Sequence, residues 1–294
     1  MDYKRIGILG ATSFVGERLL PLLIADGWQV TAFSRKKVEQ SSMGVDWRQI
    51  SPLPNPPFTQ VEWNIHSWIC VAPIWVLTDY FELLEKHGVC RIVTLSSTSR
   101  YTKDTSSDPQ ERAIAHQLID AEERLRAWAE SKDVEWIILR PTLIYGLGRD
   151  KNISEIALFI RRFGFFPLFG RAQGLRQPVH AEDVASACFT ALITPGVKNQ
   201  AYNISGSETL GYRDMVSRIF VALGRNPRFF TVPIRTFRLA VACLRLLPRY
   251  RHWSAAMAER MNRDMVFDHA NAVRDFGYCP RAFMLSRKDV SGLL

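Results

Sequence analysis

The sequence predicts an α/β protein with a doubly wound parallel sheet and a smaller, mostly helical C-terminal lobe. Short apolar runs of strand length alternate with longer amphipathic segments through the first half of the chain. A turn containing two glycines joins the first apolar run to the first helical segment. This alternation is typical of parallel strands joined by crossover helices that cover both faces of a sheet. The rhythm fades after about residue 150, and we expect the lobe to begin there.

Each element follows from its own pattern. Strands are expected at 4–9, 29–33, 68–71, 90–95 and 134–139, and helices at 17–26, 76–86 and 109–131. A helix at 179–192 and a strand at 201–204 are expected to return to the sheet. Pro21 lies inside the first helix and predicts a kink, since proline removes a helical hydrogen bond. Four prolines in 51–57 predict a surface loop.

Composition excludes several classes of protein. The 294 residues are 47% hydrophobic and 23% charged, which is ordinary for a soluble globular chain. No apolar run approaches the roughly 20 residues of a membrane-spanning helix, and we find no signal peptide. The five cysteines are far apart and form no CxxC pair, so neither a disulfide framework nor a metal site is indicated. We expect a reduced, cytoplasmic protein.

The turn after the first strand predicts a dinucleotide site. Gly10 permits a tight turn, and Gly16 lets the next helix approach the sheet and direct its free N–H groups toward a pyrophosphate. Ser13 stands where the usual pattern has a middle glycine, and its hydroxyl is small enough to contact a phosphate. The predicted contacts in this turn are Gly10, Thr12, Ser13, Phe14, Val15 and Gly16.

The end of the second strand predicts which dinucleotide is bound. An acidic residue there favours NAD by bonding the ribose 2′-hydroxyl. This chain has Ser34, Arg35 and Lys36 instead. Positive charge suits a 2′-phosphate, so NADP(H) is predicted over NAD(H). The alternative is that these residues are an ordinary solvated loop.

Four segments follow one another along the chain: Gly-Ala-Thr-Ser-Phe-Val-Gly at 10–16, Leu-Ser-Ser-Thr at 95–98, Leu-Arg-Pro-Thr-Leu-Ile-Tyr-Gly at 139–146 and Pro-Val-His-Ala-Glu-Asp-Val at 178–184. In this order they resemble the extended short-chain dehydrogenases, the NAD-dependent epimerase/dehydratase proteins that act on nucleotide sugars. The resemblance implies a Rossmann-type NADP-binding domain from 1–150 and 178–205, and a substrate lobe from 151–177 and 206–294. It also implies cofactor contacts at Ala72, Pro73, Ser96, Ser97 and Leu143, and substrate contacts at Arg140 and Tyr145.

The family's catalytic pair is missing from this chain. In the family a serine or threonine works with a tyrosine and a lysine four residues after it, and Thr98 resembles the first member. The positions of the tyrosine and lysine are Ile114 and Leu118 here, and no tyrosine in the chain has a lysine at +4. Tyr101 is the best substitute acid or base, although an ordinary loop tyrosine is the commoner alternative. Lys103 and His116 are weaker substitutes.

Two further patterns have alternative readings. His180 and Asp183 lie three residues apart, but the resemblance favours a structural role near the junction of the lobes. Arg140 is as readily an ion-pair partner as a substrate ligand.

The C-terminal third carries most of the net charge of +9. From residue 201 onward there are 15 basic and 7 acidic residues, and seven arginines but no acid lie between Arg225 and Arg251. This bias favours an anionic partner. In 233–248, Arg235, Arg238 and Arg245 fall on one side of a predicted helix, which fits a substrate wall, a membrane-surface helix or a solvated face. No nucleic-acid module is present.

Two functions remain open at this point. The first is an NADP(H)-dependent epimerase, dehydratase or other oxidoreductase that acts on an anionic small molecule such as a nucleotide sugar. The second is a non-catalytic NADP-binding protein with a structural or redox-sensing role, such as the accessory subunit of respiratory complex I in this superfamily. The sequence does not determine the oligomeric state.

Overall fold

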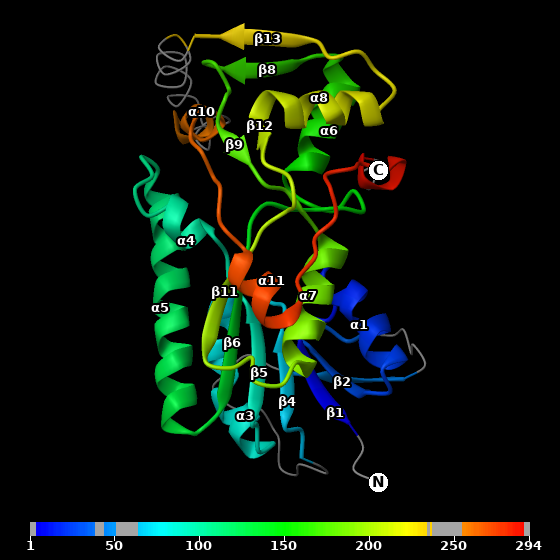
Figure 1. The fold of residues 1–294 in the computed structure, drawn as a ribbon, viewed down its shortest axis with the longest axis vertical. Coiled ribbons are helices and arrows are strands. Elements are labelled where there is room, and N and C mark those ends of the chain that lie inside the picture. The colour runs from blue at the N-terminus through cyan, green and yellow to red at the C-terminus, as the bar shows by residue number, and fades with distance from the viewer. Residues whose placement is uncertain (1–3, 39–43, 51–63, 234–235, 237–254, 291–294) are drawn as a thin grey trace.

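A seven-stranded parallel sheet forms the centre of the protein (Figure 1). The computed structural model describes residues 4–38, 44–50, 64–233, 236 and 255–290. The strands lie in the order β11-β6-β5-β4-β1-β2-β3. Their bounds are β1 Arg5–Leu9, β2 Gln29–Ser34, β3 Val45–Gln49, β4 Ser67–Cys70, β5 Arg91–Leu95, β6 Glu135–Pro141 and β11 Gln200–Ile204. The predicted Rossmann-type fold is therefore confirmed.

Helices cover both faces of the sheet, because successive strand residues point to opposite sides. On one face α1 (Gly16–Ala25), α7 (Ala181–Ile193) and α11 (Ala270–Phe276) pack in one apolar cluster with residues such as Ile6 and Ile8 of β1. On the other face α2 (Ile74–Leu77), α3 (Phe81–Lys86) and α5 (Pro109–Ser131) pack in a second cluster. A short 3-10 helix, η1 (Thr78–Tyr80), joins α2 to α3.

Most of the elements predicted for this domain match the structure, with some differences. The expected helix at 76–86 is divided into α2, η1 and α3. Pro21 lies within α1, which continues to Ala25 and ends before Gly27, as predicted. The sequence analysis missed β3, an edge strand whose polar Asp46 and Arg48 break the apolar pattern of a buried strand. The proline-rich loop at 51–57 lies outside the described residues.

The C-terminal lobe has its own apolar cluster, which includes Tyr145, Phe220 and Phe283. Its helices are α6 (Ile153–Phe163), α8 (Tyr212–Ala222), α10 (Ala255–Asn262) and α12 (Arg287–Val290). Small strand pairs complete it: β8 (Phe166–Phe169) with β13 (Phe229–Val232), and β9 (Leu175–Arg176) with β12 (Leu210–Gly211). A further pair, β7 (Ile144–Tyr145) with β10 (Val179–His180), lies between the two parts.

One part of the segment assigned to the substrate lobe covers the sheet instead. Ala272 and Phe276 of α11 and the following Tyr278 belong to the same apolar cluster as β1 and α7. Tyr202 of β11 also donates a hydrogen bond to Asp275, at 3.0 Å. The chain thus returns to the sheet near its C-terminal end before it reaches α12, as Figure 1 shows. None of the described helices is long and apolar enough to cross a membrane.

Candidate functional site

The turn between β1 and α1 has room for backbone only. Gly10 has φ +86, and a Cβ built on it would lie 2.5 Å from the backbone nitrogen of Ala72. A Cβ on Gly16 would lie 2.6 Å from the carbonyl oxygens of Gly10 and Ala11. Both positions therefore require glycine, as the tight turn and close helix approach of dinucleotide-binding folds do. The structure fits a dinucleotide at this point.

The turn lies where the sheet changes direction. From β1 the chain proceeds to β2 and β3 on one side and then returns to β4 on the other side of β1. In such sheets the ligand crevice lies outside the carboxyl ends of the two strands beside this reversal. The structure brings Gly10 and Ala72 together there, and Pro73 begins α2 beside them.

The other turn residues divide into accessible and buried groups. Thr12 is exposed, whereas Val15 is 3% exposed and Phe14 packs against the first apolar cluster. The Ser13 hydroxyl accepts a hydrogen bond from the Gly16 N–H at 3.0 Å and keeps its own hydrogen to donate. Phosphate contacts from Phe14 and Val15 are therefore limited to their backbone.

The predicted ribose-reading residues lie at the end of β2. Arg35 and Lys36 are exposed, and Ser34 accepts a hydrogen bond from the Lys36 N–H at 3.2 Å. Gln49 of β3 donates to the Arg35 carbonyl at 3.3 Å. These bonds hold the backbone of this loop while the two basic side chains remain available to a 2′-phosphate.

A buried carboxylate, which the sequence analysis missed, organises the ends of β5 and β6. Glu122 of α5 is 0% exposed. It accepts hydrogen bonds from Ser96 at 2.5 Å and from Arg140 Nε and Nη2 at 3.0 and 2.5 Å, and it also pairs with Arg100. A bidentate guanidinium contact fixes both partners in one orientation. The signal in the sequence was its position, one helical turn after Leu118.

Tyr101 stands at the accessible end of this network. Arg140 donates a hydrogen bond to the Tyr101 hydroxyl oxygen at 2.6 Å. The Arg100 and Arg140 guanidinium carbons lie 5.2 and 5.5 Å from the centre of its ring. The residue is 44% exposed, so its O–H remains free to donate outward. Two arginines against one glutamate leave net positive charge beside the phenol.

Ser96 and Thr98, which follow β5, are buried. Thr98 is 6% exposed and donates its hydroxyl hydrogen to the Pro141 carbonyl at 3.2 Å. Ser96 is 8% exposed and donates to Glu122, while Ser97 accepts from the Ser99 N–H at 3.1 Å. Within the short helix α4 (Ser99–Thr102) and the turn before it, Tyr101 is therefore the group best placed to meet a ligand.

The positions of the family's catalytic pair are apolar in space as well as in sequence. Leu118 is 4% exposed in the second apolar cluster, and Ile114 packs against that cluster. Neither can move a proton. Burial and the nearby Arg260 lower the pKa of Lys103, which stands two residues after Tyr101. His116 is exposed, 3.9 Å from Asp104.

The two predicted substrate contacts, Tyr145 and Arg140, are held by contacts within the protein. Tyr145 is 1% exposed, and its ring packs against His180 and Phe283. Burial raises the pKa of its hydroxyl, and the negative charge of Asp289 raises it further. The expectation that Tyr145 faces substrate is corrected, because its ring belongs to the core of the lobe. Leu143 packs against the same core. Arg140 forms an ion pair with Glu122 and donates a hydrogen bond to the exposed Tyr101.

His180 and Asp183 have the structural role that the resemblance implied. His180 accepts a hydrogen bond from the Glu182 N–H, and Asp183 binds Arg281. The other nitrogen of His180 lies 3.5 Å from Asp289. Burial of Asp289 opposes its ionisation, but hydrogen bonds from His180, Ser286 and the Leu147 N–H hold its pKa well below the ordinary value.

Comparisons with known proteins agree with this geometry. Residues 76–205 match the model of the NAD dependent epimerase/dehydratase family. Among the solved structures with a similar fold are UDP-sugar 4-epimerases and a dTDP-glucose 4,6-dehydratase. The UDP-glucuronic acid 4-epimerase from Bacillus cereus in complex with NAD superposes with a TM-score of 0.71 at 14% identity, over 97% of this chain and 95% of that one. RMD from Pseudomonas aeruginosa, complexed with NADPH, has a TM-score of 0.68 at 15% identity, over 97% and 95%.

The curated relatives include a reductase and a subunit of NADH dehydrogenase. The 2-alkyl-3-oxoalkanoate reductase of Stenotrophomonas maltophilia is 26% identical over 94% of this chain and 95% of its own length. The mitochondrial NADH dehydrogenase [ubiquinone] 1 alpha subcomplex subunit 9 of Dictyostelium discoideum is 27% identical over 72% of this chain and 62% of its own length. The chain therefore resembles both a reductase and a respiratory-complex subunit.

Most of the basic segment at 233–248 lies outside the described residues. Arg235, Arg238 and Arg245 lie outside the described residues. No group of His, Cys, Asp or Glu suited to a metal ion is present in the part of the chain that the structure describes.

Proposed function

We propose that this protein is an NADP(H)-dependent oxidoreductase that transfers hydride at an alcohol or carbonyl carbon of an anionic substrate, with Tyr101 as the acid or base. The observation that carries the proposal is the chain of contacts from Glu122 through Arg140 to Tyr101. It supplies a fixed, charged partner for a tyrosine at the same end of the sheet where the family's own pair is missing.

The cofactor part of the proposal rests on the glycine turn and the loop after β2. Gly10 and Gly16 permit the close turn from which a helix start can bind a pyrophosphate, and Arg35 and Lys36 offer positive charge to a 2′-phosphate. A bound nicotinamide would supply or accept the hydride. The preference for NADP(H) over NAD(H) rests on these two side chains.

The acid–base part follows from the geometry of Tyr101. Arg140 donates to the phenolic oxygen, so the phenol hydrogen is directed elsewhere and can be given to a substrate oxygen as it gains negative charge. The guanidinium groups of Arg100 and Arg140 then stabilise the phenolate that remains. In the oxidative direction the same group removes the proton of a substrate alcohol. Glu122 keeps Arg140 in place.

The substrate class follows from the same charges and from the relatives. The net positive charge beside Tyr101 favours a substrate that carries a carboxylate or a phosphate close to the reacting carbon. A 3-oxo acid, as in the name of the Stenotrophomonas reductase, and a nucleotide sugar both meet this requirement. We propose these two groups as the first substrates to assay.

The test is to assay NADPH oxidation against both groups of substrate and then to replace Tyr101. Tyr101→Phe is expected to lower kcat by about 10²–10⁴-fold without changing the Kd for NADPH. Tyr202→Phe is the matched control, since that hydroxyl bonds Asp275 of α11, away from the site. Equal losses in the two variants, or an unchanged kcat in Tyr101→Phe, would remove Tyr101 from the mechanism.

A second candidate is a non-catalytic NADP-binding protein. Two observations favour it: apolar residues at the positions of the catalytic pair, and the likeness to subunit 9 of NADH dehydrogenase. In that case NADPH would copurify with the protein, no substrate of either group would be turned over, and Tyr101→Phe would change nothing.

A further inference from the structure

The tip of the C-terminal lobe carries an exposed apolar and basic surface that the proposed function does not use. It is formed by the end of α6 and the turn after it, together with the end of α8 and the loop that leads to β13. We call this surface the lobe tip. Its members are Leu158, Arg161, Arg162, Phe163, Phe165, Val221, Arg225 and Arg228.

The two segments of the lobe tip lie against each other. Arg225 donates hydrogen bonds to the carbonyls of Ile160 and Arg161, at 2.7 and 3.2 Å. The Phe166 N–H donates to the Arg228 carbonyl at 2.9 Å, where β8 and β13 begin to pair. The ends of α6 and α8 therefore meet at one end of the lobe.

Large apolar side chains on the lobe tip face solvent. The exposed fractions are 41% for Leu158, 51% for Phe163, 38% for Phe165 and 68% for Val221. These are four of the twelve exposed large hydrophobic residues in the described part of the chain. Soluble surfaces rarely gather such residues, and a gathered set marks a contact with a protein or a membrane.

The charge on the lobe tip is of one sign. The sequence has no Asp or Glu from Ile156 to Ala181, and none from Met215 to Ala258. Four arginines accompany the apolar side chains, and the guanidinium carbon of Arg162 lies 5.4 Å from the centre of the Phe163 ring. A protein partner would need matching acids at every point, whereas anionic lipids supply negative charge continuously.

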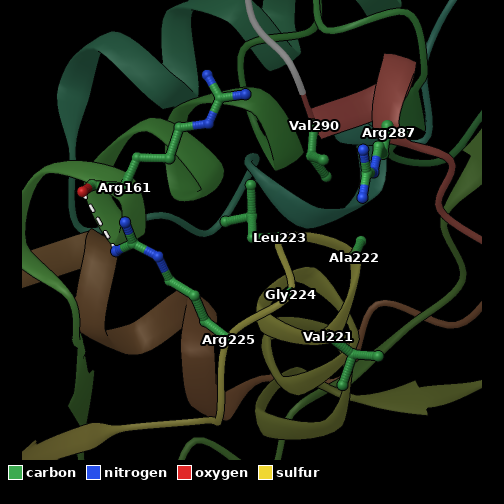
Figure 2. Close-up of a pocket in the computed structure, with 8 residues that line it drawn as sticks. All are labelled: Arg161, Val221, Ala222, Leu223, Gly224, Arg225, Arg287 and Val290. Atoms are coloured by element: carbon green, nitrogen blue, oxygen red, sulfur yellow. Dashed lines mark hydrogen bonds between the residues drawn. The ribbon is translucent and has the colours of Figure 1, made fainter.

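A shallow hollow beside these residues suits a lipid headgroup. Its volume is about 490 Å³, and it lies between the end of α8, α6 and α12. Figure 2 shows Arg161, Arg225 and Arg287 around a floor that includes Leu223 and Val290. Among the described residues that line it there is no acid. Guanidinium groups around an apolar floor match a phosphate that is attached to acyl chains.

We propose that the lobe tip docks on an anionic phospholipid bilayer, with the phenylalanines in the interface and a headgroup phosphate at the arginine-lined hollow. Figure 1 shows β8, β13 and α8 at the end of the molecule far from the sheet. The carboxyl ends of β1 and β4 therefore lie away from the lipid that the lobe tip would contact. This inference does not depend on the proposed function.

The test is flotation of the full chain with vesicles of phosphatidylcholine alone and with vesicles that also contain phosphatidylglycerol. We expect binding only to the second kind, falling steeply as salt is raised. The pairs Phe163→Ser/Phe165→Ser and Arg161→Gln/Arg162→Gln are each expected to weaken binding on the order of tenfold or more. Matched controls are Val273→Ser, which is 47% exposed on α11 beside the sheet, and Arg124→Gln on α5.

Several results would overturn the proposal. They are equal binding to neutral vesicles, no flotation at all, and equal losses in the control variants. Flotation that survives both lobe-tip changes but disappears in Arg238→Gln/Arg245→Gln would place the contact in another segment. Self-association abolished by the lobe-tip changes, without flotation, would mean that a second copy covers the surface. Thermal stabilisation by inorganic phosphate without flotation would mean a site for a free anion. Unfolding temperature and NADPH binding of each variant verify that it is folded.

Discussion

The glycine turn between β1 and α1 and the ends of β5 and β6 lie on the same edge of the sheet. They differ in how many of the residues typical of the family they contain. At the turn, Gly10 and Gly16 lie against backbone atoms that leave no space for a Cβ, and these two glycines of the pattern are present although Ser13 replaces the middle one. At β5 and β6, side chains meet side chains, and a different set has taken over: Glu122, Arg140 and Tyr101 stand near apolar Ile114 and Leu118. A glycine packed against backbone allows no other residue, whereas a group of contacting side chains can be replaced by another group.

The largest effect that separates the two regions should come from Glu122→Ala. This change leaves the Arg100 and Arg140 guanidinium groups without their buried carboxylate and is expected to cost about 3–5 kcal/mol of unfolding free energy. Urea denaturation measures it. Glu123→Ala is the control, because the neighbouring glutamate is exposed and should change stability little. If the two variants were equally stable, Arg100 and Arg140 would not depend on the Glu122 carboxylate.

The next effect concerns the turn. Gly16→Val would place side-chain atoms against the carbonyl oxygens of Gly10 and Ala11, so we expect NADPH to bind about a hundredfold more weakly. Titration of NADPH fluorescence measures the Kd. Gly27→Ala serves as a control, since nothing lies within 4 Å of its Cβ position although its φ of +80 costs some stability. Normal binding by Gly16→Val would mean that the cofactor lies elsewhere.

The smallest effect tests the choice between the two dinucleotides. Arg35→Ala is expected to weaken NADPH binding about tenfold and to leave NADH binding unchanged, because only NADPH carries the 2′-phosphate. Parallel titrations with both cofactors give the ratio of affinities. Arg48→Ala on the neighbouring strand β3 is a control for a general loss of positive charge. A preference that stays the same in Arg35→Ala would remove the argument for NADP(H).

Local sequence signals determined much of the fold. The helix α5 has the bounds that its pattern predicts, since Asp108 accepts a hydrogen bond from the Gln110 N–H and Pro109 begins the helix. The glycine turn, the alternation of strands and helices, and the absence of a Tyr/Lys pair were also readable from the chain. Each of these depends on residues that are close together in the sequence.

The candidate catalytic network was decided only by the tertiary structure. Glu122 and Glu123 are identical neighbours in the sequence, yet one is fully buried and the other exposed. The difference arises because α5 turns Glu122 toward the sheet, where Arg140 of β6 and Arg100 of α4 meet it. Burial of a carboxylate requires charged partners. Here they come from other elements: Arg100 is 22 residues away from Glu122 along the chain and Arg140 is 18 residues away. No local pattern records that meeting.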